Sequence, residues 1–508
     1  MGTQKLDIYN GQKVDIAKIP IYDEESFRNE IITNCREASR IAGLFGMPDE
    51  NGGVRIIAIL GKDEDSDLGL LSLRISKDKP FYKSLTPDLP EAHWFEREIA
   101  EQYAITPVNH PWLKPVRYHK NYRNVPDIWH GIGDQPISGE YPFYKLKGHE
   151  SHEVAVGPVH AGVIEPGHFR FQCHGEEIIH LEIQLGFQHR GIEKMMEEVS
   201  FERAILIAEA IAGDTVIGHT SAYCQLLESL SDTLISPRAD ALRAIALELE
   251  RLACHSGDIG FLSADIGFLP IASYFGRIRG EFLNMLLLIS GSRFGKSFCR
   301  PGGVLFDIDE KMKADLSARL ENLKKEIIDL EDVLFSKPSV LSRFEGVGII
   351  SETTAKELGL VGPVARASGL GRDVRTDYAF GMYRFSHLPM TTVTSGDVFA
   401  RAQLRWLEMQ RSMDFILDLL NELPKGEICK PLKPLKPNKF ALAMVEGWRG
   451  EIMHAAFTGN NSEFTRYKIK DPSFHNWMAL AMAVRGAQIS DFPLCNKSFN
   501  LSYCGHDL

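Results

Sequence analysis

Histidine is concentrated in one part of the chain. Seven of the 17 histidines fall within 41 residues, at His149, His152, His160, His168, His174, His180 and His189. Imidazole nitrogen is a common metal ligand, so a metal site is one interpretation of this cluster. The spacings match no standard ligand pattern, however, and histidines in loops and hairpins also lie at surfaces and partner contacts. We assign most of them to this second group and keep His160 and His168 as candidates, because of the motif around them.

A second set of polar residues follows one predicted helix. Ser236 and Pro237 are typical of a helix start, with serine as the cap and proline in the first turn. Four polar residues follow at separations of 4, 3 and 7 positions, on the same side of that helix: Arg251, His255, Asp258 and Asp265. A solvent-exposed face is the commonest fate of such charges. If the row is instead buried, its groups would pair and shift their pKa values, as in a proton relay. Both interpretations stay open.

Several familiar catalytic motifs are missing from the sequence. There is no GxxxxGKS/T loop, and no GxGxxG lies between a predicted strand and a helix, so nucleotide binding by this chain alone is unsupported. Neither a GxSxG nucleophile elbow nor an HExxH zinc helix occurs.

The elements that would position these residues predict a multi-domain chain. Residues 1–118 indicate an α+β domain, in which an acidic turn joins strands at 54–60 and 68–75 into a hairpin. Residues 119–156, rich in Pro, Gly, Tyr and Asn, predict an extended linker. From residue 157 to 508 we expect a mainly α-helical domain with a small β-hairpin region, whose turn is at Gly175. Further helices are predicted at 309–335 and 401–423.

Composition excludes several classes of protein. In 508 residues, 57 Lys and Arg stand against 68 Asp and Glu, a net charge of −11, which argues against a nucleic-acid partner. No run reaches the roughly 18 apolar residues of a membrane-spanning helix, and the first 15 residues lack an apolar signal core. The eight cysteines never form CxxC, as expected of reduced thiols. We expect a cytoplasmic protein.

Longer motifs resemble one specific family, the large subunits of membrane-bound, energy-converting (group 4) NiFe hydrogenases and the related 49-kDa quinone-site subunit of respiratory complex I. The motifs are GPVHAGVIEPGHFRF at 157–171, HRGIEK at 189–194, RPGGV at 300–304, RASG at 366–369, DVR at 373–375, GDVF at 396–399, EGWRGE at 446–451 and DPSFHNW at 471–477. Residues 94–105 (WFEREIAEQYAI) with His110-Pro111 are similar to the 30-kDa subunit of complex I. The resemblance therefore implies a 30-kDa-like domain fused to a 49-kDa-like domain.

The resemblance fails at the metal ligands. In working hydrogenases of this family, two CxxC pairs hold nickel and iron, and thiolate is the donor that such a site needs. The corresponding positions here are Ala212 and Thr215, just ahead of His219, and Ser502 and Gly505. We call these four residues the ligand-equivalent positions. Cys495 and Cys504 could form a substitute metal site, but we interpret them as core residues. No metal or cofactor is expected on this chain itself.

The complex I side of the resemblance is incomplete. Asp265 corresponds to that family's carboxylate, which couples quinone chemistry to proton movement, whereas Gly213 stands where its quinone-binding tyrosine would be. His168 lies in the loop of the quinone-contacting histidine, but the loop has the hydrogenase length. A quinone at an interface with a membrane subunit is therefore still an option.

These observations predict a peripheral subunit of a membrane-bound, complex I-like oxidoreductase on the inner face of the cell membrane. It would couple electron transfer, to a quinone or another acceptor, to ion translocation. Expected partners are an iron–sulfur small subunit, which carries the cluster, and integral membrane subunits of the quinone-chamber and antiporter-like types.

Roles for single residues follow from the same resemblance. His160, Glu165, His168 and Glu193 would line the cavity, and His255, Asp258 and Asp265 would pass protons. His219 joins His160 and Glu193 as a cofactor-binding candidate. For Glu165 and Glu193, a role in locking an interface is the alternative. The whole chain has two alternatives as well: an active hydrogenase with a non-standard metal site, and a non-catalytic scaffold between an iron–sulfur arm and an antiporter-like module.

Overall fold

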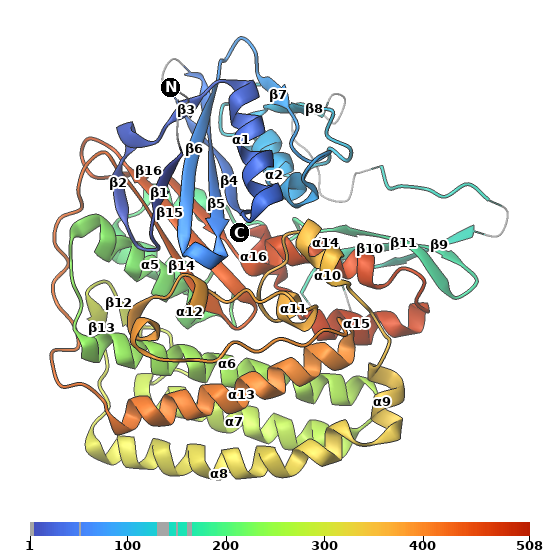
Figure 1. Ribbon diagram of the computed structural model, residues 1–508, viewed down its shortest axis with the longest axis vertical. Coiled ribbons are helices and arrows are strands. Elements are labelled where there is room, and N and C mark those ends of the chain that lie inside the picture. The colour runs from blue at the N-terminus through green and yellow to red at the C-terminus, as the bar shows by residue number, and fades with distance from the viewer. Residues whose placement is uncertain (1–4, 50–51, 130–141, 149–150, 160–164) are drawn as a thin grey trace.

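A computed structural model describes residues 5–49, 52–129, 142–148, 151–159 and 165–508. Figure 1 shows three layers: an N-terminal sheet with its helices, a second sheet below it, and a stack of long helices at the base. Among the described residues, no helix combines the length and the apolarity needed to cross a membrane.

The N-terminal layer is the predicted α+β unit. Its sheet has the order β1-β6-β5-β4, with β3 parallel to β6. Lys62 pairs with Asp67 across the acidic turn, which confirms the predicted hairpin. The elements are β1 (Leu6–Ile8), η1 (Ile16–Lys18), β3 (Ile21–Tyr22), α1 (Glu24–Glu37), β4 (Arg40–Pro48), β5 (Val54–Lys62), η3 (Asp63–Asp65), β6 (Asp67–Ile75), β7 (Phe81–Lys83), η4 (Pro90–Ala92), α2 (His93–Tyr103) and β8 (Thr106–Val108).

The middle sheet was not foreseen from the sequence. Its order is β16-β15-β14-β2, built from β14 (Lys439–Gly447), β15 (Gly450–Thr458), β16 (Phe464–Lys470) and the N-terminal β2 (Lys13–Asp15). β14 and β15 are apolar along nearly their whole length, as is common for strands covered on both faces. Because β2 pairs with β14, the N-terminal part of the chain contributes a strand to the C-terminal sheet.

The base consists of long helices, as predicted after residue 190. They are α5 (Val216–Ser231), α6 (Pro237–Asp265), α7 (Leu269–Ser290), α8 (Glu310–Phe335) and α13 (Val398–Asn421). Ser236 Oγ accepts from the Ala239 N–H at 3.1 Å, so the predicted cap of α6 is confirmed. α13 begins before residue 401, at Val398, because the Asp397 carboxylate caps it through the Ala400 N–H.

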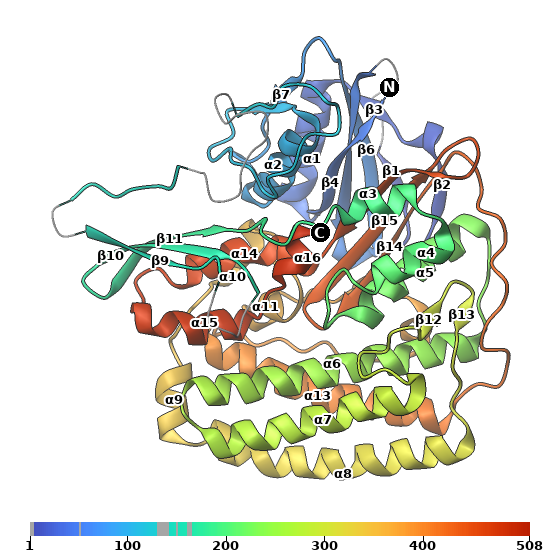
Figure 2. The ribbon, with the colours of Figure 1, turned by 180° about the vertical axis from the view of Figure 1, so that it is seen from behind.

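A three-stranded sheet extends sideways from the layers (Figures 1 and 2). β10 (His168–His174) and β11 (Glu177–Gln184) form the hairpin predicted around Gly175, and β9 (Ser151–Val156), within the predicted linker, pairs with β10. The domain boundaries at 118 and 157 stay a prediction. The other elements are α3 (Ile192–Glu198), α4 (Phe201–Ala208), β12 (Cys299–Arg300), β13 (Gly303–Val304), α9 (Pro338–Phe344), α10 (Glu352–Glu357), α11 (Gly362–Ala367), α12 (Val374–Asp377), η5 (Gly381–Phe385), α14 (Pro472–Ala483), η6 (Ile489–Asp491), α15 (Phe492–Phe499) and α16 (Tyr503–Asp507).

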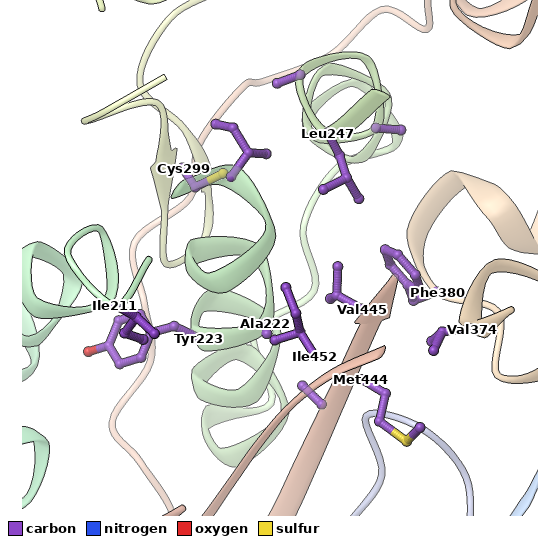
Figure 3. Close-up of a cluster of buried hydrophobic side chains, with 14 of the residues drawn as sticks. Ile211, Ala222, Tyr223, Leu247, Cys299, Val374, Phe380, Met444, Val445 and Ile452 are labelled. Atoms are coloured by element: carbon purple, nitrogen blue, oxygen red, sulfur yellow. The ribbon is translucent and has the colours of Figure 1, made fainter. Parts of the chain in front are cut away.

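The main hydrophobic core lies between α5, α6 and the middle sheet. Figure 3 shows Ala222 of α5, Leu247 of α6 and Val445 and Ile452 of the sheet around the same interior. In Figure 2, α3, α4 and α5 lie over this sheet. This packing fixes the start of α5, and the first pair of ligand-equivalent positions lies just before it, with Thr215 as the residue that precedes the helix.

Candidate functional site

Two of the ligand-equivalent positions, Ser502 and Gly505, lie beside one carboxylate, Asp471, which caps α14 through the Ser473 N–H at 2.8 Å. Ser502 caps the short helix α16, and its N–H donates to Ser473 Oγ at 2.8 Å. A Cβ atom added at Gly505 would lie 2.7 Å from Asp471 Oδ2. The Asp471 carboxylate therefore fills the space that a side chain at position 505 would need.

Asp471 ends a buried chain of hydrogen bonds. His219 Nε2 lies 3.2 Å from Asp471 Oδ2, and His219 Nδ1 lies 3.1 Å from His454 Nε2. The Tyr467 hydroxyl completes the chain, 2.7 Å from His454 Nδ1. All four side chains are buried.

The protonation states along this hydrogen-bond chain follow from the pKa shifts of Asp471 and His454. Burial alone would raise the pKa of Asp471, but the hydrogen bond from His219 and the positive charge of Arg449 outweigh burial and lower it. Burial lowers the pKa of His454 well below its usual value. An ionised Asp471 only accepts hydrogen bonds, so His219 Nε2 must donate to it. We therefore assign His454 Nε2 as the donor to His219 Nδ1, and the Tyr467 hydroxyl as the donor to His454 Nδ1.

A second ion pair faces outward beside this chain. Arg449 donates to both Asp214 oxygens, at 2.6 and 2.9 Å, and its guanidinium stacks 3.9 Å above the Trp448 ring. Trp448 Nε1 donates to Thr215 Oγ1 at 3.1 Å, so this ligand-equivalent position serves as a hydrogen-bond acceptor. The Asp214 side chain is 36% exposed, and a Cβ atom at Gly213 would meet nothing within 4 Å. The site is therefore open toward Gly213 and Asp214.

The donor atoms do not fit a nickel–iron centre. The ligand-equivalent positions offer a methyl group, two hydroxyls and a hydrogen, where soft metals need thiolates. Burial raises the pKa of Cys504 and that of Cys495 to about 11, so both are protonated thiols at neutral pH. Within the described part of the chain, no three His, Cys, Asp or Glu residues gather in a way that could hold a metal ion.

Two of the cavity candidates from the sequence lie near this site or at its edge. Glu165 accepts from the Cys504 N–H at 2.9 Å and so contacts the first turn of α16. His168 is buried at the start of β10, with Nδ1 3.3 Å from the Gly157 carbonyl and Nε2 3.3 Å from Arg170 Nε. His160 lies outside the described residues.

Glu193 has a structural role rather than the expected cofactor-binding one. Its Oε1 accepts from Lys468 Nζ at 2.8 Å and from the Ile469 N–H at 3.1 Å. Its Oε2 accepts from Arg466 at 2.8 Å and from Gln102 at 3.3 Å. With four donors bound, no acceptor capacity is directed at a ligand. The structure therefore favours the alternative interpretation, in which Glu193 locks α3 against β16 and α2.

The polar row on α6 does not form one relay. The helix does continue to Asp265, but its polar residues divide among different partners, and only Arg251 and His255 share one, Glu408. His255 Nε2 lies 2.9 Å from Glu408 Oε2, and burial lowers the pKa of His255, so it is neutral. Asp258 accepts from Arg405 and Asn500, both at 2.6 Å. Asp265, the last residue of α6, is exposed. It is thus set apart from the buried His255 and Asp258, partial burial raises its pKa, and its role in passing protons stays a prediction.

A buried ion network was missed by the sequence reasoning. Its members, all from distant segments, are Glu248, Arg251, Arg366, Asp373, Arg375, Glu408 and Glu446. Arg366 contacts two of these carboxylates, Glu408 at 2.7 Å and Glu446 at 2.8 Å. Burial and then Asp373 raise the pKa of Glu446 to about 7. The sequence did contain a sign of this network, because the motifs at 366–369, 373–375 and 446–451 carry charged residues. The resemblance identified these motifs but did not show that their charged side chains contact one another.

Comparison with known proteins agrees with both halves of the chain. Residues 265–439 and 433–507 match the family described as the 49 Kd subunit of respiratory-chain NADH dehydrogenase, and residues 43–141 match the 30 Kd subunit. The chain is 28% identical to formate hydrogenlyase subunit 5 of Escherichia coli (strain K12), over 92% of this chain and 84% of that protein. It is 31% identical to the carbon monoxide-induced hydrogenase of Rhodospirillum rubrum, over 69% of this chain and 97% of that protein.

A solved structure is also similar. It is a chain of the membrane-bound sulfane sulfur reductase, described as an archaeal respiratory membrane complex, with a TM-score of 0.66 and 25% sequence identity. The match covers 71% of this chain and 99% of that chain.

Proposed function

The chain belongs to the family of the 49-kDa subunit of respiratory-chain NADH dehydrogenase and the large subunits of membrane-bound hydrogenases, and on this premise we propose that it is a peripheral subunit of a membrane-bound oxidoreductase complex. The complex couples electron transfer, to a quinone or another acceptor, to ion translocation. This chain takes part without a nickel–iron centre.

The contact between Gly505 and Asp471 carries this proposal. A cysteine at position 505 requires the Asp471 carboxylate to move, and that carboxylate is held by His219 and by the Ser473 N–H. Hydrogen-bonded groups thus occupy the place that corresponds to the metal ligands of the hydrogenases. A carboxylate–imidazole pair at this place suits proton transfer to an acceptor reduced nearby.

The open side of the site supplies what an acceptor needs. Gly213 leaves room, and Arg449, paired with Asp214, places a positive charge next to the hydrogen-bond chain from Asp471 to Tyr467. A positive charge favours an acceptor that becomes more negative as it takes up electrons. We assign Arg449 to fixing Asp214 at the open side of the site and His219 to delivering the acceptor's proton.

The partners follow from the relatives. The sulfane sulfur reductase is described as a membrane complex, and another relative, from Pyrococcus furiosus, is named membrane-bound hydrogenase subunit alpha. We propose that this chain docks onto an iron–sulfur small subunit and onto membrane subunits, on the cytoplasmic side of the membrane. Electrons reach it from the partner's cluster.

The test uses the complex purified through a tag on this chain. We expect far less than one nickel per complex by mass spectrometry, with viologen-driven reduction of a quinone analogue. His219→Gln should lower turnover at least tenfold with the complex intact, whereas Arg319→Gln, on the exposed side of α8, should not. Stoichiometric nickel with hydrogen evolution would establish the hydrogenase alternative. Full turnover in His219→Gln would favour the scaffold.

A further inference from the structure

A pocket of about 940 Å³ lies at the other end of α5 from the ligand-equivalent positions. The pocket-lining residue of α5 nearest to Thr215 is Ser221, six steps or about 9 Å along the helix axis, and the rest of the lining lies farther away, so the pocket is separate from the candidate site. Its walls come from the turn before β2, the second half of α5, the first turns of α6, and η5. Leu247 and Phe380, visible in Figure 3, form part of its apolar lining.

One carboxylate in this pocket has no partner. Asp240, in the first turn of α6, forms no side-chain hydrogen bond and no ion pair with any residue that the structure describes. The neighbouring Glu228 is fully used, because Arg243 donates to both of its oxygens at 2.6 and 3.0 Å. Burial, and then Glu228, raise the pKa of Asp240 to about 6, against the opposing charges of Arg243 and Arg384. At neutral pH the pocket therefore holds a largely ionised, half-buried carboxylate.

Two polar side chains on α5 that line the same pocket as Asp240 are also available to bind a ligand. Gln225 and Ser229 lie one turn apart on α5 and line the same pocket. Across the described chain, neither side chain makes a hydrogen bond. A half-buried carboxylate, amide and hydroxyl without partners are uncommon, because such groups are usually paired when water is partly excluded. Together they favour a ligand with several N–H donors and a positive charge.

The rim of the pocket distinguishes a small ligand from a polypeptide. Leu234 and Phe385, which both line the pocket, are each 82% exposed. A small molecule seated beside Asp240 would leave these two side chains in water. A polypeptide that crosses the mouth would cover both and place one side chain inside.

We propose that this pocket receives a segment of a partner subunit, with a lysine or arginine opposite Asp240 and apolar residues over Leu234 and Phe385. The proposal rests on the proposed function only in that the chain assembles with other subunits. The net charge of −11 makes a basic segment the complementary partner. Three cations line the pocket. Lys13 is paired with Asp232 and Arg243 with Glu228, whereas Arg384, exposed at the rim, is the one that the incoming side chain must pass without a carboxylate bound to it in the described part of the chain.

Carboxyl labelling tests this directly. The isolated full-length chain and the assembled complex are treated with a carbodiimide and glycine ethyl ester, and labelling is measured residue by residue. We expect labelling of Asp240 to fall at least tenfold in the complex, while the exposed Asp329 of α8 stays unchanged. Equal labelling of Asp240 in an intact complex would overturn this inference alone. A chain that purifies without partners would contradict the proposed function as well.

Cross-linking identifies the occupant. A photoreactive p-benzoylphenylalanine at position 385 should attach to a peptide of another subunit that carries Lys or Arg close to an apolar residue. Asp240→Asn should weaken recovery of the complex at least fivefold in 0.3 M salt, with an unchanged melting temperature for the isolated chain. Attachment to a second copy of this chain or to lipid, or the absence of any attachment, contradicts the proposal.

Discussion

Gly505 and Asp471 depend on each other, since the carboxylate occupies the volume that any side chain at 505 would take. This dependence supports the proposal that the chain works without a nickel–iron centre. Replacing thiolates alone would leave buried polar groups without partners, at about 1–3 kcal/mol for each unsatisfied group. Here Asp471 has His219 and the Ser473 N–H, and His219 has His454, so these polar groups are paired.

Gly505→Ala tests this dependence. A Cβ atom there lies 2.7 Å from Asp471 Oδ2 and 2.8 Å from Ser502 Oγ, so we expect a loss of about 1–3 kcal/mol in the free energy of unfolding. Urea denaturation of the full chain measures it. In the Asp471→Ala background, the methyl group added at position 505 should cost much less free energy of unfolding. A double-mutant cycle that combines the two substitutions measures this difference. Gly276→Ala, where a Cβ atom meets nothing within 4 Å, is the control and should not destabilise. Equal effects at both glycines would contradict the account.

At the scale of elements, the helices and hairpins that depend on local sequence patterns could be predicted, whereas contacts between distant segments could not. The hairpin turn at 62–67 and the cap Ser236 are short-range patterns, and the structure confirms the elements that they predict. The middle sheet was missed because β14 is apolar from Phe440 to Val445 and β15 mixes apolar residues with Glu451 and His454. Neither strand shows the alternation that distinguishes a strand from a buried helix. Likewise, Asp258 could be placed on α6, but its partner Arg405, 147 residues away, could not.

The start of α5 has an unusual cap with a pH-dependent consequence. Glu250 of α6 accepts from the Ile217 N–H at 2.7 Å and from the Gly218 N–H at 3.1 Å. Burial raises the pKa of Glu250 from 4.5 to about 8, against these two hydrogen bonds, so the folded chain keeps a proton that the unfolded chain releases above pH 4.5. The contribution of Glu250 to stability is therefore full below pH 4.5 and declines up to pH 8, by at most about 1.4 kcal/mol per pH unit.

Glu250→Gln, which imitates the protonated acid, should flatten this decline. We expect variant and wild-type chains to have similar unfolding free energies at pH 5, and the variant to be the more stable at pH 8. Glu321→Gln, on the exposed face of α8, serves as the control and should leave the pH profile unchanged. If both variants keep the wild-type slope between pH 5 and 8, Glu250 is ionised in the folded chain.

At the scale of the whole molecule, the two family-matched parts share one interior. Lys468 of β16 donates to Glu98 of α2 at 2.6 and 2.7 Å and to Glu193 of α3 at 2.8 Å. Arg40 of β4 likewise binds Glu451 of β15, and β2 is a strand of the C-terminal sheet. Buried ion pairs are weak evidence for stability, but removing one partner leaves an uncompensated charge.

Lys468→Met should therefore destabilise both parts together. The methionine keeps the apolar stem but removes the hydrogen bonds that Lys468 donates to Glu98 and Glu193. Each carboxylate keeps another cation, Arg117 for Glu98 and Arg466 for Glu193, so we expect a cost of about 1.5–3 kcal/mol in the free energy of unfolding. Because the lost contact joins the two parts, hydrogen exchange should speed up in β5 of the N-terminal sheet as well as in β15 of the middle sheet. Lys324→Met, which removes an exposed pair with Asp414, is the matched control and should cost less than about 1 kcal/mol. Faster exchange confined to β15 would show instead that the N-terminal part is stable by itself and merely rests on the sheet below it.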